Sequence, residues 1–71
     1  MQTQPPSIRL MDQREAAKLL RLSERTLERL RVQGGGPLFV KCGRSVRYRE
    51  VDLERWIAQR VVSSTSEEAA Q

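Results

Sequence analysis

Arginine and lysine side chains crowd the middle of this sequence. The 71 residues include 13 basic and 9 acidic residues, which gives a formal net charge of +4 at pH 7. Between Arg21 and Arg49 the imbalance is larger, because eight basic residues stand against only two acidic ones, Glu24 and Glu28. Arginine presents a planar fork of donors that matches phosphate oxygens and guanine edges. A basic middle with slightly acidic flanks therefore predicts a surface for a nucleic acid.

The sequence lacks the residue sets that catalysis or metal binding would need. It has no histidine and a single cysteine, Cys42, which leaves neither an internal disulfide nor a zinc site of Cys and His ligands. The three glycines at 34–36 end a helical pattern instead of opening one, so they do not predict a phosphate-binding loop. We therefore expect no enzymatic activity, no cofactor and no metal. Without a basic partner or a second thiol, Cys42 is expected to have no redox role.

Two short helices are predicted in the first half of the chain, with only a few residues between them. Asp12 and Glu15 have the spacing of a capping box, and a first helix should follow over 13–20. Ser23 is the next N-cap candidate, and a second helix should run from 24 to about 33, where Gly34 begins a glycine-proline break. The apolar period predicts that these helices bury Ala16, Ala17, Leu20, Leu27 and Leu30. A break this short sets the second helix steeply across the first, as in a helix-turn-helix.

A hairpin and a third helix are predicted to follow the glycines. Residues 38–41 and 46–49 are short β-prone runs around a four-residue turn, 42–45. In the second run Val46 and Tyr48 share one face, and Arg47 and Arg49 share the other. A last helix over about 50–61 should turn an apolar stripe to the core, formed by Leu53, Trp56 and Ile57. We expect residues 1–9 to be a flexible arm, 10–61 to be the folded domain, and 62–71 to be a disordered tail.

The order of these motifs resembles one family. The run AAKLLRLSERTLERLRVQGGGPLFVKCGRSVRYREVDLERWI is similar to excisionase and MerR-type winged helix-turn-helix domains. It contains an alanine pair, a Ser-x-x-Thr-Leu second helix, a Gly-Pro break, a Val-Lys-x-Gly-Arg wing, an Arg-Tyr-Arg strand and an Asp-Leu-x-x-Trp helix. The resemblance implies a mainly α fold with a small β-hairpin, in the order α-turn-α-β-β-α. One departure is Arg21, which stands where the family usually has a glycine in a left-handed conformation.

The second helix carries the residues that we expect to read DNA. In the implied fold this helix enters the major groove, and the face opposite its buried leucines presents Arg25, Glu28 and Arg29. The arginines, one turn apart, can reach guanine edges or phosphates, and Glu28 could accept from a cytosine amino group or hold an arginine in place. Outside this context the same face would be an ordinary solvated surface with ion pairs. The predicted recognition-helix set is Ser23, Arg25, Thr26, Glu28 and Arg29, with Ser23 mainly a cap.

The hairpin supplies a second set of candidate contacts. The resemblance implies that the wing lies along the minor groove or the backbone, where Arg44 or Arg47 could sense groove width. Arg49 is the weakest candidate, because it could instead pair with Glu50 or Asp52. The predicted wing set is Lys41, Arg44, Ser45, Arg47 and Arg49. Tyr48 and Trp56 are expected to be core residues.

Two DNA-binding roles follow from the resemblance. The first is an excisionase, or recombination directionality factor, which bends DNA near an attachment site and steers an integrase toward excising a mobile element. The alternative is a small transcriptional regulator of prophage or mobile-element genes. MerR-type regulators continue into a dimerisation helix and an effector domain, which we do not expect here, so the excisionase role is favoured. The expected partners are double-stranded DNA, a phage-type integrase and neighbouring copies bound head to tail. Neither a membrane span nor a secretory signal is apparent, so we expect a cytoplasmic protein without a small-molecule ligand.

Overall fold

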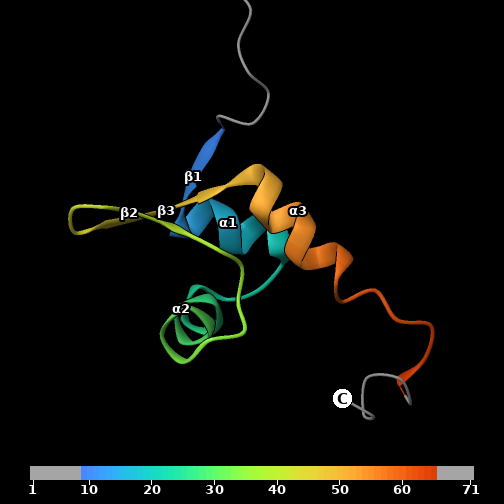
Figure 1. Cartoon of the computed structure of the whole chain (residues 1–71). Coiled ribbons are helices and arrows are strands. Elements are labelled where there is room, and N and C mark those ends of the chain that lie inside the picture. The colour runs from blue at the N-terminus through green and yellow to red at the C-terminus, as the bar shows by residue number, and fades with distance from the viewer. Residues whose placement is uncertain (1–8, 66–71) are drawn as a thin grey trace, which may run out of the picture.

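The computed structural model describes residues 9–65, which form three helices and a small antiparallel sheet (Figure 1). The elements follow one another as β1 (Leu10–Asp12), α1 (Gln13–Leu20), α2 (Glu24–Gln33), β2 (Val40–Cys42), β3 (Ser45–Arg49) and α3 (Glu50–Ala58). The strand order in the sheet is β1-β3-β2. The winged helix-turn-helix predicted from the sequence is confirmed, with β1 as an addition that the sequence pattern did not indicate.

The first two helices have the predicted bounds, and their caps explain why. The Asp12 backbone N–H donates to Glu15 Oε1 at 2.9 Å, while the Glu15 N–H donates to Asp12 Oδ1 at 2.8 Å. At the start of α2 the Thr26 N–H donates to Ser23 Oγ at 3.0 Å. These bonds satisfy N–H groups that have no partner inside the helix, so they fix where each helix begins.

The turn between α1 and α2 depends on a left-handed arginine. Arg21 has φ 59° and ψ 39°, a left-handed conformation that glycine adopts more easily than any other residue. Its N–H donates to the Lys18 carbonyl at 3.2 Å, and the Leu22 N–H donates to the Ala17 carbonyl at 2.9 Å. The unusual backbone at this position is what ends α1 and redirects the chain into α2.

The hairpin differs from its prediction in its turn. Cys42 pairs with Ser45, so the connection has two residues, Gly43 and Arg44, and not the expected four. Gly43 has φ +65°, and a positive φ at the first turn position suits the twist of a tight hairpin. The first strand of the hairpin correspondingly begins at Val40 and not at residue 38.

The third strand of the sheet comes from the segment just before α1. Met11 of β1 lies opposite Tyr48 of β3, and both side chains are buried. Because the residues flanking Met11 are exposed, this strand has only one core residue to give it a sequence signature. The pairing nevertheless ties the start of α1 to the centre of the sheet.

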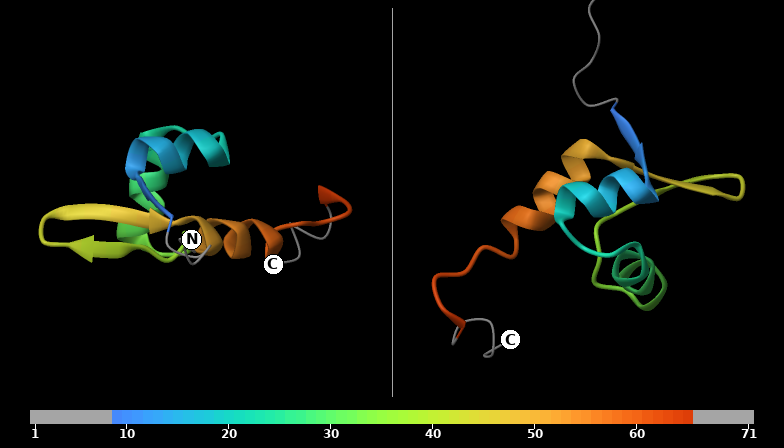
Figure 2. Two further views of the ribbon diagram at one scale, coloured as in Figure 1. Left: turned by 90° about the horizontal axis from the view of Figure 1, so that it is seen from above. Right: turned by 180° about the vertical axis from the view of Figure 1, so that it is seen from behind.

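The core lies between the sheet and the first two helices. Figure 2 shows α1 and α2 on one side of the sheet, with α3 continuing beyond the end of β3. Five of the six elements contribute buried apolar side chains: Met11, Ala16, Ala17, Leu27, Tyr48 and Leu53. Leu20 and Val46 are partly buried and pack against this cluster.

The third helix turns less of its surface inward than predicted. It ends at Ala58, with Gln59 as its C-cap, and not at about residue 61. Of its expected core stripe only Leu53 is fully buried, whereas Trp56 is half-buried and Ile57 is 40% exposed. Leu20 and Leu30 are also only half-buried. The reason is that α3 packs mainly against β3 and does not lie across the helix pair.

Residues 1–8 of the predicted flexible arm and residues 66–71 of the predicted disordered tail lie outside the described residues, and both stay predictions. Within residues 9–65 no helix is both long and apolar enough to span a membrane.

Candidate nucleic-acid interface

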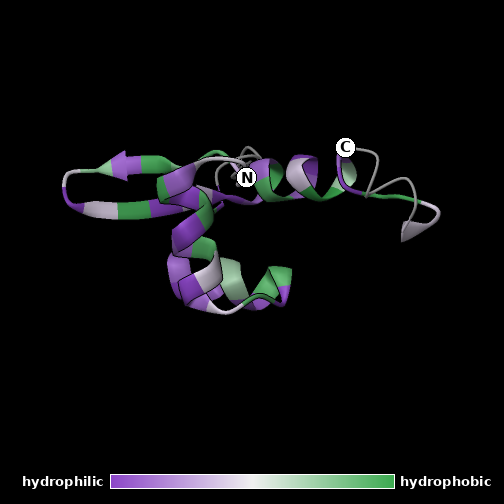
Figure 3. Cartoon of the chain, turned by 90° about the horizontal axis from the view of Figure 1, so that it is seen from below, coloured by the Kyte–Doolittle hydropathy of each residue, from purple (hydrophilic) through white to green (hydrophobic). Residues whose placement is uncertain are grey.

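α2 is the most hydrophilic of the three helices, and hydrophilic residues predominate along its ribbon (Figure 3). Arg25, Glu28 and Arg29 are exposed there, and with Val32 and Gln33 they line a shallow open groove of about 350 Å³. Among the described residues neither arginine makes a hydrogen bond or an ion pair, so the expected alternative of a face held by ion pairs is not what this structure contains. Two unpaired guanidinium groups one helical turn apart are therefore presented to solvent.

Ser23 and Thr26 are mainly structural. Besides accepting from the Thr26 N–H, the Ser23 hydroxyl donates to Thr26 Oγ1 at 2.9 Å. Ser23 is exposed and Thr26 is half-buried at the first turn of α2. Both residues lie at the N-terminus of α2, and the bonds observed for them serve the helix cap.

The β2–β3 hairpin projects from the body beside α2, which is seen end-on beneath it in Figure 1. Lys41, Arg44 and Ser45 are exposed, with Arg44 in the turn itself. Lys41 lies opposite Val46 and therefore shares the face of the sheet that carries Tyr48. Arg47 lies opposite Val40 on the other face, half-buried, and its Nη1 donates to the Val46 carbonyl at 2.9 Å. The wing thus carries cations on both of its faces and at its tip.

Arg49 is committed to an internal partner. Its Nε and Nη2 donate to the two carboxylate oxygens of Asp52 at 2.6 and 2.9 Å, and the Asp52 side chain is buried. These hydrogen bonds lower the pKa of Asp52 against the opposing effect of desolvation, and they raise the pKa of Arg49. Of the two carboxylates weighed from the sequence, the partner is therefore Asp52 and not Glu50.

Arg31, which also belongs to the basic middle segment, points inward. Its Nη2 donates to Gln13 Oε1 at 3.4 Å, and its guanidinium lies 5.9 Å from the centre of the Phe39 ring. Burial raises the pKa of the Tyr48 phenol, and the positive charge of Arg31 partly offsets this. Arg31 and Arg49 are thus structural cations, so the charge count of the segment overstates the cationic surface.

The matching family model is described as a helix-turn-helix domain, and it covers residues 10–61. This chain belongs to the helix-turn-helix domain family. No curated protein matches the sequence. Helix-turn-helix domains bind DNA through their second helix, and α2 holds that position here. The protein is therefore a DNA-binding protein of the helix-turn-helix type.

One contact of this helix-turn-helix domain had no signal in the sequence. Trp56, expected in the core, donates its indole N–H to the Gly35 carbonyl at 2.8 Å, and Arg60 donates to the same oxygen at 2.7 Å. The donors lie 21 and 25 residues from their acceptor, so no local spacing indicates them. They fasten the segment that joins the recognition helix to the wing.

Proposed function

We propose that this protein inserts α2 into the major groove and its wing into the adjacent minor groove, and acts as an excisionase-type accessory factor. In that role it bends DNA beside the attachment site of a mobile element and directs an integrase toward excision. The observation that carries the proposal is the distribution of cations over the wing. The exposed arginine pair of α2 supports the sequence-reading part.

The arginine face of α2 supports base recognition in the major groove. Arg25 and Arg29 are exposed and unpaired, and each guanidinium can donate two parallel bonds to the O6 and N7 atoms of a guanine. Glu28 lines the same groove and can accept from a cytosine amino group. The proposed contacts of Ser23 and Thr26 are restricted to the backbone, since their hydroxyls already serve the helix cap.

The two-faced wing supports insertion between phosphate backbones. A minor groove is walled by a strand on each side, and a hairpin with Lys41 on one face and Arg47 on the other can approach both strands at once. Arg44 at the tip would then enter the groove, where a narrow width strengthens the negative potential. Proteins that bind the minor groove commonly bend the duplex, which is the activity that an accessory recombination factor needs. Arg49 is left out of this proposed surface because Asp52 engages it.

The first experiment identifies a target and measures bending. Duplexes selected by the full chain from a random library would be end-labelled with a donor and acceptor pair, and energy transfer would be compared with and without protein. The proposal expects a specific site and a shorter end-to-end distance in the complex. Failure to enrich any duplex would overturn DNA binding, and a saturated but straight duplex would overturn the accessory role.

Two variants separate reading from positioning on that duplex. Arg25→Ala should relax the base preference at one position and cost about 1–3 kcal/mol on the preferred site. Arg44→Ala should weaken binding to all duplexes alike and reduce the salt slope by about 1. Arg55→Ala, which removes an exposed cation from α3, is the control for net charge. Indistinguishable behaviour of the first two variants would contradict the division between helix and wing.

The genomic position of the selected site separates the two biological roles. Sites that flank a recombination attachment site, next to an integrase gene, would support the excisionase role. Sites confined to promoters, with no effect of the protein on excision, would support a transcriptional regulator instead. Protection of adjacent repeats at higher protein concentration would support binding of neighbouring copies, because a single module of this size has a small contact area.

A further inference from the structure

The carbonyl of Gly35 accepts two hydrogen bonds from the end of α3. Trp56 Nε1 donates to it at 2.8 Å and Arg60 Nη2 donates to it at 2.7 Å. The Arg60 guanidinium also lies 4.1 Å from the centre of the Trp56 ring, and its Nη1 donates to the Trp56 carbonyl at 3.3 Å. We call this arrangement of Trp56, Arg60 and the Gly35 carbonyl the Gly35 clasp.

The clasp holds a segment that begins with two glycines, which have no side chains to pack against the rest of the fold. Gly34 and Gly35 have φ of +101° and +91°, and a Cβ on either residue would meet nothing within 4 Å. Glycine gains more conformations than any other residue when it is released, so a pair of glycines is a natural hinge. The hydrogen bonds from Trp56 and Arg60 to the Gly35 carbonyl hold this glycine pair in place.

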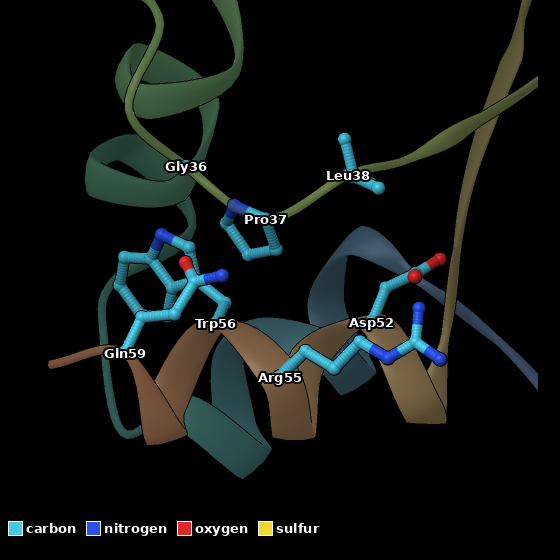
Figure 4. A pocket seen from close by; sticks show the side chains of 7 residues that line it. All are labelled: Gly36, Pro37, Leu38, Asp52, Arg55, Trp56 and Gln59. Carbon is cyan, nitrogen blue, oxygen red and sulfur yellow. The ribbon is translucent and has the colours of Figure 1, made fainter. Parts of the chain in front are cut away.

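The recognition helix depends on this segment at its C-terminal end. Along α2 only Leu27, near the middle, is fully buried, and the helix packs mainly against α1. Val32, in the last turn, is 70% exposed. Beyond α2, Gly36 approaches Leu30 closely and Pro37 is buried, so the linker folds back on the helix (Figure 4). A fixed linker therefore supports the last turn of α2.

The same segment leads directly into the wing. Residues 34–39 connect the end of α2 to Val40, the first residue of β2. Figure 4 shows Trp56 reaching from α3 toward the Gly36–Pro37 stretch, across a hollow of about 320 Å³. Two hydrogen bonds, from Trp56 of α3 and from Arg60 just beyond its end, thus reach the segment that joins α2 to the wing.

We propose that Trp56 and Arg60 are positioning residues for DNA binding, which set the recognition helix and the wing at the spacing that two adjacent grooves require. This inference rests on the proposed use of α2 and the wing on DNA. Neither residue needs to touch DNA in this role, because the guanidinium and the indole N–H are already engaged with the protein. When the clasp is lost, the junction must be ordered during binding, and that cost reduces the affinity.

The test uses variants of the full chain that change one property each. Trp56→Phe removes the indole N–H and keeps an aromatic ring beneath the guanidinium, and Arg60→Ala removes the other donor with its charge. Arg55→Ala removes an equal charge from α3 without affecting the donors to Gly35. Each variant is compared with the wild type in the salt dependence of its affinity for the selected duplex, in conditions where urea titration shows all proteins to be folded. Amide hydrogen exchange of the free proteins is followed at residues 31–34, where the Gly34 N–H donates to the Leu30 carbonyl.

The expected result is a loss of affinity of about threefold to tenfold for Trp56→Phe and for Arg60→Ala. Exchange in the last turn of α2 should become faster, α1 should be unchanged, and the salt slope should stay that of Arg55→Ala. A slope reduced by about 1 for Arg60→Ala alone, with unchanged exchange, would instead identify a direct phosphate contact and overturn the inference. Faster exchange with unaltered affinity would also overturn it. If the wild type binds no duplex, the proposed function fails, while the exchange data still show whether the clasp holds the linker.

Discussion

Replacing Arg21 by glycine should stabilise the protein. Among residues 9–65, Arg21 is the only non-glycine residue with a positive φ, at φ 59° and ψ 39°. An L-residue with a side chain pays about 1–2 kcal/mol in this conformation. Glycine removes that strain but gives the unfolded chain more freedom, which costs about 0.4–1 kcal/mol. The net expectation is an increase of up to about 1.6 kcal/mol in the free energy of unfolding, and the middle of that range, about 0.8 kcal/mol, corresponds to roughly 3–6 °C in Tm for a domain of this size.

Urea unfolding followed by circular dichroism at pH 7 measures this effect, and three variants separate strain from charge. Arg21→Ala removes the charge and keeps the strain, so it should match the wild type. Arg21→Asn tolerates the left-handed region better than alanine and should lie between alanine and glycine. The backbone bonds of the turn remain in every variant, because Arg21 contributes only its N–H. A glycine variant no more stable than the alanine variant would refute the assignment of strain to this residue.

Two further predictions concern the linker and the α3 cap. Gly36→Ala should lower the free energy of unfolding by about 1–3 kcal/mol, because a Cβ there would lie 2.8 Å from the Leu30 Cβ. An unchanged Tm would contradict this prediction and would mean that the linker can move away from Leu30. Asp52, whose pKa is lowered mainly by the hydrogen bonds from Arg49, binds a proton less readily in the folded state than in the unfolded state. Its stabilisation should therefore be complete above the unfolded carboxyl pKa of about 4 and be lost as the pH falls through the lower folded value, and Asp52→Asn should remove this part of the acid sensitivity in urea titrations from pH 7 to pH 2.

The helix-turn-helix could be predicted from sequence because its boundaries are decided locally. Asp12 bonds the N–H of Glu15, and Ser23 bonds the N–H of Thr26, each only three residues away, so the local spacing is enough to predict these bonds. The glycine at position 34 likewise ends α2 through its own backbone conformation. Helix caps of this kind can therefore be predicted from the local sequence, without reference to the tertiary structure.

The sheet was harder to predict because its pairings join distant residues. Met11 is the only buried residue of β1, and its partner Tyr48 is far along the chain. The hairpin turn was placed two residues too wide, since cross-strand register and not composition decides that Cys42 pairs with Ser45. The same limit applies to Trp56, whose apolar character indicated burial while its indole N–H decided its position.

The difference between charge in the sequence and charge on the surface bears directly on DNA binding. Of the eight cations between residues 21 and 49, Arg31 and Arg49 are engaged by other side chains, whereas Arg47 bonds only the carbonyl of its neighbour Val46. This leaves six cations for phosphates and bases: Arg21, Arg25, Arg29, Lys41, Arg44 and Arg47. Neutralising six phosphates would give a slope of log affinity against log salt of about −5. A measured slope near this value is expected for the proposed surface, and contacts to bases would make it shallower. A much steeper slope would require cations from outside the segment, and α1, which carries Arg14 and Lys18 on its exposed side, would then have to lie against the DNA backbone.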